Sequence, residues 1–203
     1  MRTQITAGIR KASETADVPA YQLWTTMAAK LLPPVQPGDI HLNPQQLAEP
    51  PKVTPFPGVL LSKDGLLQTS SACQHDRPLT YPAILAGPGP GYFDTNNEAK
   101  PWAQVALAGD AEISGIVLVN RYELPPANEE FLWAAPLKVQ SSPDGKTWTD
   151  VATCDKADVV MRIDLAGKVP RARYLRIERQ VTDPAKPPRL HFRNFLIYGK
   201  KLY

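Results

Sequence analysis

The stretch Leu137-Lys-Val-Gln-Ser-Ser-Pro-Asp-Gly-Lys-Thr-Trp148 decides the fold class of this chain. Its centre, Ser142-Pro143-Asp144-Gly145, is a turn signal, because proline presets φ, aspartate bonds the backbone ahead of it and glycine accepts a positive φ. Apolar and polar residues alternate on both sides of the turn, in LKVQSS and in TWTDVAT. Such a pattern is typical of a β-hairpin with one buried face.

Short β-type runs separated by turn residues extend from this hairpin in both directions, over residues 59–203. No helical period separates them, which favours an antiparallel β-sandwich or jelly roll over an alternating α/β fold. The expected strands are 65–70, 103–107, 113–120, 137–142, 147–153, 159–164, 174–179 and 192–198.

Proline is the outlier in the composition, with 22 of 203 residues, about twice its usual share. This density excludes a helix bundle and favours strands joined by irregular loops, because proline fixes φ and lacks a backbone donor. Hydrophobic residues make up 43% of the chain, which is enough to fill a core. The net charge is only +3 and the basic residues are spread along the chain, which argues against a nucleic-acid partner.

The first 58 residues differ from the rest and predict two separate segments. Residues 1–32 carry apolar residues at helical spacing in two runs, with Pro19 near the start of the second. A helical pair this short needs a surface to pack on, either the rest of this chain or the end of a preceding domain. Eight prolines between positions 33 and 57 then predict an extended segment over 33–58, either a linker or a strap that wraps the following domain.

Several functional classes lack their sequence signals. No stretch reaches the roughly 18 to 20 consecutive apolar residues of a membrane span, and residues 1–19 lack the apolar segment of a secretory signal. The chain is therefore expected either to be cytosolic or to be part of a longer chain. Neither GxSxG nor HExxH occurs, and spacing singles out no pair of carboxylates, so we expect no enzyme activity.

A known family shares a series of segments with this chain. Besides the hairpin, they are Leu67-Gln-Thr-Ser-Ser71, Lys100-Pro-Trp-Ala-Gln-Val-Ala-Leu107, Ile113-Ser-Gly-Ile-Val-Leu-Val-Asn-Arg121, Ala172-Arg-Tyr-Leu-Arg-Ile177 and Phe195-Leu-Ile-Tyr-Gly199. In this order they resemble the discoidin, or coagulation factor 5/8 type C, domain and its bacterial carbohydrate-binding relatives of the family 32 type. The resemblance covers residues 59–203 and implies a jelly roll with the galactose-binding-like fold.

The resemblance also implies a function, because such domains bind sugars or phospholipid headgroups with loops at one end. We expect a non-catalytic carbohydrate-binding module, the C-terminal accessory domain of a larger secreted bacterial carbohydrate-active protein. Its partners would be a glycan and a parent enzyme or neighbouring domain contacted through residues 1–57, in an extracellular or periplasmic setting. The alternative is a structural or protein-interaction domain without a sugar ligand. The implied ligand loops are 72–79, 92–98, 121–133, 154–158 and 180–191.

Three residues of the 121–133 loop are candidate ligand contacts. The ring of Trp133 or Phe131 offers a platform for the apolar face of a sugar. The guanidinium of Arg121 matches two adjacent hydroxyls or a carboxylate. The structural alternatives are that the two rings plug the loop's own core and that Arg121 pairs with an acidic residue of the same loop.

Polar and aromatic residues of the other loops are further candidates. A histidine offers one donor and one acceptor to a sugar hydroxyl, although a solvated turn has the same composition. These candidates are His75 and Arg77 in the first loop, Tyr92, Phe93 and Asn97 in the second, and His191 in the last.

The resemblance also implies a structural calcium ion, which this sequence does not favour. Where many relatives have a carboxylate-rich segment and a glutamate in the last strand, this chain has Ala86-Gly87 and Asn194. Calcium prefers several anionic oxygens, so we expect no cofactor, with Asp94 as a weak candidate ligand.

The two cysteines, Cys73 and Cys154, are far apart in the sequence. Tracing the expected strands up and down the sandwich places both at the same end, where a disulfide is geometrically possible. The alternative is a pair of buried thiols.

Overall fold

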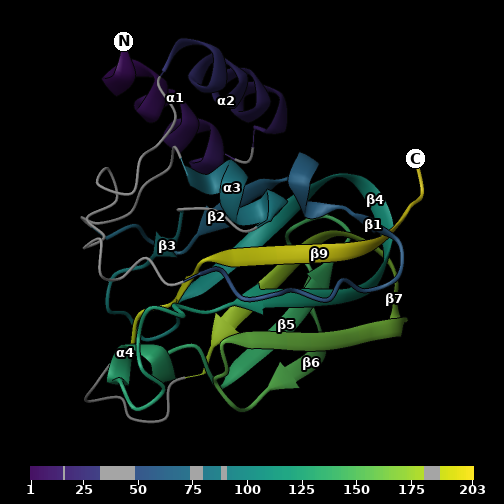
Figure 1. The fold of residues 1–203 in the computed structure, drawn as a ribbon. Coiled ribbons are helices and arrows are strands. Elements are labelled where there is room, and N and C mark those ends of the chain that lie inside the picture. The colour runs from purple at the N-terminus through teal and green to yellow at the C-terminus, as the bar shows by residue number, and fades with distance from the viewer. Residues whose placement is uncertain (16, 33–48, 74–79, 88–90, 181–187) are drawn as a thin grey trace.

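The structure is a computed structural model and describes residues 1–15, 17–32, 49–73, 80–87, 91–180 and 188–203 (Figure 1). Its helices are α1 (Arg2–Glu14), α2 (Val18–Leu31), the 3-10 turn η3 (Ser62–Asp64), α3 (Tyr81–Ala86) and α4 (Glu129–Leu132). Its strands are β1 (Val59–Leu60), β2 (Leu66–Thr69), β3 (Phe93–Asp94), β4 (Trp102–Val119), β5 (Leu137–Ser142), β6 (Thr149–Cys154), β7 (Val160–Arg179), β8 (His191–Phe192) and β9 (Asn194–Lys201).

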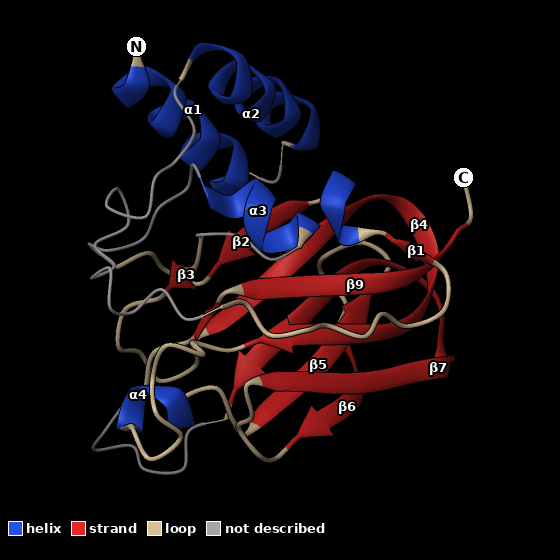
Figure 2. Cartoon of the chain, in the orientation of Figure 1, coloured by secondary structure: helices blue, strands red, loops and turns tan. Residues whose placement is uncertain are grey.

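The strands form an antiparallel β-sandwich, as the sequence predicts, with α1 and α2 packed against one side (Figure 2). One layer holds β2, the first half of β4, the second half of β7, β5 and β6. The other layer holds β1, β9, the second half of β4 and the first half of β7. Strands β4 and β7 therefore belong to both layers and join them.

Strands β4 and β7 are continuous where the sequence predicts two strands each. The register between them shifts at Ala106, Ala111 and Ile113, and Gly167 in β7 has a φ of 72°. Bulges and a glycine in the left-handed region bend a strand sharply without ending it. The stretches expected to be loops, 108–112 and 165–173, are bends at which each strand passes from one layer to the other.

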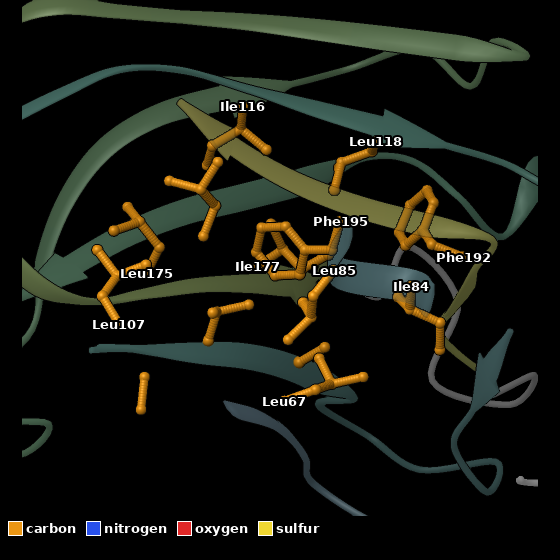
Figure 3. Packing of buried hydrophobic residues seen from close by; sticks show 14 of the residues in the cluster. Leu67, Ile84, Leu85, Leu107, Ile116, Leu118, Leu175, Ile177, Phe192 and Phe195 are labelled. Carbon is orange, nitrogen blue, oxygen red and sulfur yellow. The ribbon is translucent and has the colours of Figure 1, made fainter. Parts of the chain in front are cut away.

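The core lies between the two layers (Figure 3). Leu107 and Ile116 from β4, Leu175 and Ile177 from β7, and Phe195 from β9 are fully or almost fully buried there. Helix α3, in a segment for which the sequence predicted no helix, adds Ile84 and Leu85 beside Phe195.

The helical pair packs on the sandwich and joins the same core. Ile5, Ile9 and Ala12 of α1 are buried in the cluster that includes Leu66 and Leu67 of β2. Asp17 caps α2 by accepting a hydrogen bond from Ala20 N at 3.0 Å, with proline in the first turn as expected. None of the described helices is long and apolar enough to cross a membrane.

The proline-rich segment is described from residue 49 onward, and this part lies on the outer face of the second layer. The Phe56 ring packs against Gly115 and under the Arg162 guanidinium, 4.2 Å from its carbon. Ser114 Oγ donates to the Pro57 carbonyl at 2.6 Å. Residues 49–58 therefore lie along the sandwich as a strap would, while 33–48 lie outside the described residues.

Candidate functional site

Three segments far apart in the sequence meet at one end of the sandwich, which we call the loop end. They are residues 92–97, 121–133 and 189–193. The two-stranded pair β3–β8 joins the first to the last, with Phe93 opposite Phe192 and Asp94 opposite His191. Figure 1 shows β3 and α4 on this side of the sandwich, as expected from the strand tracing.

A buried ion-pair network forms the base of the loop end. The Glu123 side chain is fully buried and bridges two arginines, with Oε1 2.8 Å from both Arg121 Nε and Arg193 NH2. Burial alone would raise the pKa of Glu123, but the charges and hydrogen bonds of Arg193 and Arg121 outweigh it, so its pKa is lowered. Both guanidinium groups also stand over the Tyr92 ring, each 5.5 Å from its centroid. These contacts fix the positions of Arg121 and Tyr92.

Arg121 extends from this network to the surface. Its side chain is 15% exposed and forms a second ion pair, from NH1 to Glu130 Oε2 at 2.8 Å. Glu130 lies in α4, which Asn128 caps by accepting from Glu130 N at 2.8 Å. Both the guanidinium and the carboxylate that face solvent are therefore held in place.

Trp133 follows α4 and packs beside His191. Their ring centroids are 6.0 Å apart, and Trp133 is half-buried whereas His191 is completely buried. Burial, followed by the positive charge of Arg121, lowers the pKa of His191 to about 3, so the ring is neutral at pH 7. His191 therefore packs against the Trp133 ring from the interior, as a neutral aromatic ring.

Arg189 forms the other polar group at the surface. Its guanidinium donates to Asn97 Oδ1 at 2.7 Å and to Asp94 Oδ2 at 3.2 Å. Cys73 Sγ donates to the same Asp94 oxygen at 3.3 Å. Burial raises the pKa of Asp94 despite these partners. Asp94 Oδ2 thus fixes Arg189, while Asp94 Oδ1 is buried without a hydrogen-bond partner among the described residues.

The candidate residues divide by burial. Arg121, Trp133 and Asn97 reach the surface of the loop end, while His75 and Arg77 lie outside the described residues. Phe93, Phe131, His191 and Tyr92 are at most 7% exposed. Their rings fill the interior that supports the loops, so in this structure these four present little surface to a ligand.

The sequence prediction missed Arg193 and did not identify Glu130 as more than a structural partner. Arg193 interrupts the apolar run HFRNFLIYG, and a lone charge in such a run indicates a buried ion pair. Its partner Glu123 lies 70 positions away, which no local pattern reveals.

Cys73 and Cys154 do not form a disulfide in this structure. Cys73 is bonded to Asp94 beside β3, whereas Cys154 ends the outermost strand β6 and contacts Met161 Sδ at 3.8 Å. Both belong to segments that reach the loop end, but each thiol faces different neighbours. Placing two cysteines at the same end of the sandwich is not enough to predict a disulfide, because the bond also requires a short distance and a suitable side-chain direction.

The residues at the position of the family's calcium ion do not fit a cation. The Asn194 side chain is 2% exposed, and its Nδ2 donates towards the carbonyls of Ala83 at 3.2 Å, Ile84 at 3.3 Å and Gly87 at 2.5 Å. Carbonyls only accept hydrogen bonds, so the amide NH2, whose two hydrogens the three carbonyls share, is assigned to this side of Asn194. A donor nitrogen therefore stands where a metal would have to bind. No cluster of three potential metal ligands occurs among the described residues.

The fold and the segments at the loop end define a class of domain. The chain belongs to the F5/8 type C domain family, whose sequence profile matches residues 68–186. No curated protein matches this sequence.

Several solved structures share the fold. The lectin-binding domain of lectinolysin, solved with Lewis b, is 17% identical with a TM-score of 0.56, over 72% of this chain and 100% of that one. A fucolectin from the serum of striped bass, Morone saxatilis, is 16% identical with a TM-score of 0.58, over 73% of this chain and 50% of that one. CpGH89CBM32-5 from Clostridium perfringens, in complex with GalNAc-β-1,3-galactose, is 10% identical with a TM-score of 0.54, over 70% and 100% of the two chains.

Proposed function

We propose that this chain is a non-catalytic carbohydrate-binding module that binds its glycan at the loop end. The observation that carries the proposal is the partly exposed set formed by Trp133, the Arg121–Glu130 pair and the Arg189–Asn97 pair. An indole ring accepts the apolar face of a pyranose, and paired charged groups bind its hydroxyls. Neighbouring side chains already hold all these groups in place, so ligand binding would cost little additional conformational entropy.

The comparisons support this ligand class, because the solved neighbours include lectin and carbohydrate-binding modules in complex with sugars. The arrangement of acidic groups supports a binding role over catalysis. Glu123 and Glu130 are both neutralised by arginine, and His191 is buried and neutral, so these residues offer no free acid or base.

We further propose that the module serves a larger secreted bacterial carbohydrate-active protein, outside the cytoplasm, with residues 1–57 adjoining its neighbouring domain. A surface site made of one aromatic ring and two residue pairs is expected to bind a sugar weakly, so tethering would supply the advantage. In this arrangement the module raises the local concentration of substrate for its partner domain.

A glycan array probed with the whole chain tests the proposal. Trp133→Ala should abolish binding to the glycans that the wild type retains, because the ring's loss removes the platform, at a cost of about 1–3 kcal/mol. Leu132→Ala is the matched control, since Leu132 is the adjacent residue, is 51% exposed and lies outside the polar set. Unchanged glycan binding by Trp133→Ala, together with a lower melting temperature, would contradict the site.

A further inference from the structure

A cavity lined by both polar and apolar residues lies outside the loop-end site, between α1 and the beginning of the sandwich. It has a volume of about 300 Å³. The residues that line it include Trp102, three polar residues of the sandwich that we call the floor residues (Gln68, Ser70 and Ser71), and two charged residues of α1 that we call the rim residues (Arg10 and Glu14). None of the residues assigned to the loop-end site lines it.

The Trp102 ring is fixed before any ligand arrives. The Arg176 guanidinium stands over the Trp102 ring, 4.5 Å from its centroid, and 3.9 Å from the Trp148 centroid. Arg176 is itself held by two hydrogen bonds to Gln104 Oε1, at 3.0 and 2.7 Å. An indole held in this way offers a rigid apolar surface to the cavity, which is what the C–H face of a sugar requires.

Hydrogen bonds also fix the floor residues. The hydroxyl oxygens of Ser70 and Ser71 can each accept one further hydrogen bond. Ser70 Oγ and Ser71 Oγ both donate to Glu98 Oε1, and they accept from the backbone nitrogens of Trp102 at 3.0 Å and of Asn96 at 2.9 Å. Each hydroxyl oxygen therefore keeps one lone pair. Gln68 Nε2 donates to the Ser13 carbonyl at 2.6 Å, which ties the floor to α1.

The two rim residues carry one positive and one negative side chain. Arg10 and Glu14 are one helical turn apart and exposed, and neither forms an ion pair with any described residue. A guanidinium fork and a carboxylate both match pairs of adjacent hydroxyls. Because the two charges cancel, the rim favours a neutral ligand over an acidic sugar or a phosphate.

We propose that this cavity is a second carbohydrate subsite, which takes one neutral pyranose residue such as the end of a glycan chain. The volume lies at the lower end for ligand sites, which suits a single sugar ring. The choice of sugar as the ligand rests on the proposed function. Because α1 supplies the rim, the subsite exists only when the N-terminal helix is packed on the sandwich.

Nuclear magnetic resonance of the whole chain tests this subsite separately from the loop end. The chain has four tryptophans, so the indole N–H of Trp102 reports the cavity while that of Trp133 reports the loop end. The probes are methyl α-L-fucopyranoside and methyl β-D-galactopyranoside. We expect at least one of them to shift the Trp102 signal in a saturable way. The double variant Arg10→Ala/Glu14→Ala should weaken this Kd about tenfold or more and leave the Trp133 response unchanged.

Lys11→Ala is the matched control, because Lys11 is exposed on the same turn of α1 and does not line the cavity. Its Kd at Trp102 should equal that of the wild type. A shift at Trp133 alone overturns the subsite and leaves the proposed function standing. A Trp102 shift that persists at full affinity in the double variant, or that disappears in Trp133→Ala, also overturns it. The absence of any shift at both rings contradicts both proposals.

Discussion

The two ends of the sandwich differ in whether their ion pairs are exposed or buried. At the end opposite the loops, which we call the turn end, Arg171 pairs with Asp110 on the surface, and the Arg171 side chain is 70% exposed. At the loop end, Arg193 and Glu123 form an ion pair whose side chains are 2% and 0% exposed. An ion pair in water contributes little to stability, whereas a buried one cannot lose a partner without leaving a desolvated charge.

The difference follows from how the chain reverses direction. The turn end needs no side-chain network, because β4 and β7 pass through it as continuous strands and Gly145 closes a tight turn with a φ of 74°. The loop end holds long connections, and among the described residues their backbone ladder is limited to the short β3–β8 pair, while 121–133 has no strand. The buried charges and rings of the loop end take the place of a longer ladder, which leaves Arg121, Trp133 and Arg189 fixed yet facing outward.

The largest effect is expected from removing the charge at the centre of the loop end. Glu123→Gln leaves Arg121 and Arg193 without their shared carboxylate, and we expect a loss of about 3–5 kcal/mol in the free energy of unfolding. Urea denaturation measures it. Glu130→Gln, on the exposed side of the same network, is the control and should cost under about 1 kcal/mol. Equal losses in the two variants would contradict the division into buried and exposed pairs.

The next effect concerns the amide at the start of β9. Asn194→Asp turns the donor into a carboxylate that faces three carbonyls, and we expect it to lower stability by about 1–3 kcal/mol. The new carboxylate and the carbonyls together form an oxygen cage, so added CaCl2 should raise the melting temperature of this variant. Asn194→Ala also loses the hydrogen bonds but should show no calcium response. A calcium response of the wild type equal to that of Asn194→Asp would contradict our interpretation of Asn194.

A pH titration sharpens the comparison further. The folded-state pKa of His191, about 3, lies below its ordinary value of 6.5, so the unfolded chain binds the proton more readily and stability falls as the pH drops below 6.5. The expected loss is about 2 kcal/mol by pH 5. His191→Phe should lack this slope. The raised pKa of Asp94 acts in the opposite direction in both proteins, so the difference between them isolates His191. Parallel curves would show that His191 is not buried as a neutral ring.

The smallest effect is expected at the turn end. Asp110→Asn removes the exposed pair with Arg171, and the free energy of unfolding should change by less than about 1 kcal/mol. The loss should shrink further at high salt, because exposed charges are screened. A loss that matches Glu123→Gln would remove the contrast between the two ends.

The architecture could be read from the sequence because it depends on local patterns. The Pro143-Asp144-Gly145 turn and the alternation around it fixed one hairpin, and the order of the remaining segments identified the sandwich. The continuity of β4 and β7 could not be read, because a bend within a strand and a loop between two strands have the same small and polar composition. Helix α3 was missed because its YPAILA segment is too short to show a helical period.

The sequence predicted which segments form the loop end, but not which of their side chains are exposed. Loop order placed Arg121, Trp133 and His191 at one end, where the structure also has them. Whether an aromatic ring in a loop is exposed depends on distant residues, so the burial of Phe131 and Phe93 could not be predicted from the sequence. Arg193 and Glu123 meet across 70 positions, and such a pair has no signature in one sequence.

The position of α1 has a consequence for how this molecule behaves in concentrated solution. Strand β2 has β4 as its neighbour within the described residues, and the Ser13 hydroxyl of α1 donates to the Leu67 carbonyl of β2. An uncovered edge strand is a template on which another chain adds by backbone pairing, and proteins often cover such edges with a helix. Helix α1 therefore covers the edge of β2 and is expected to disfavour self-association. In a shortened chain that begins at residue 49, the β2 edge would be uncovered and could pair with the β2 edge of a second molecule.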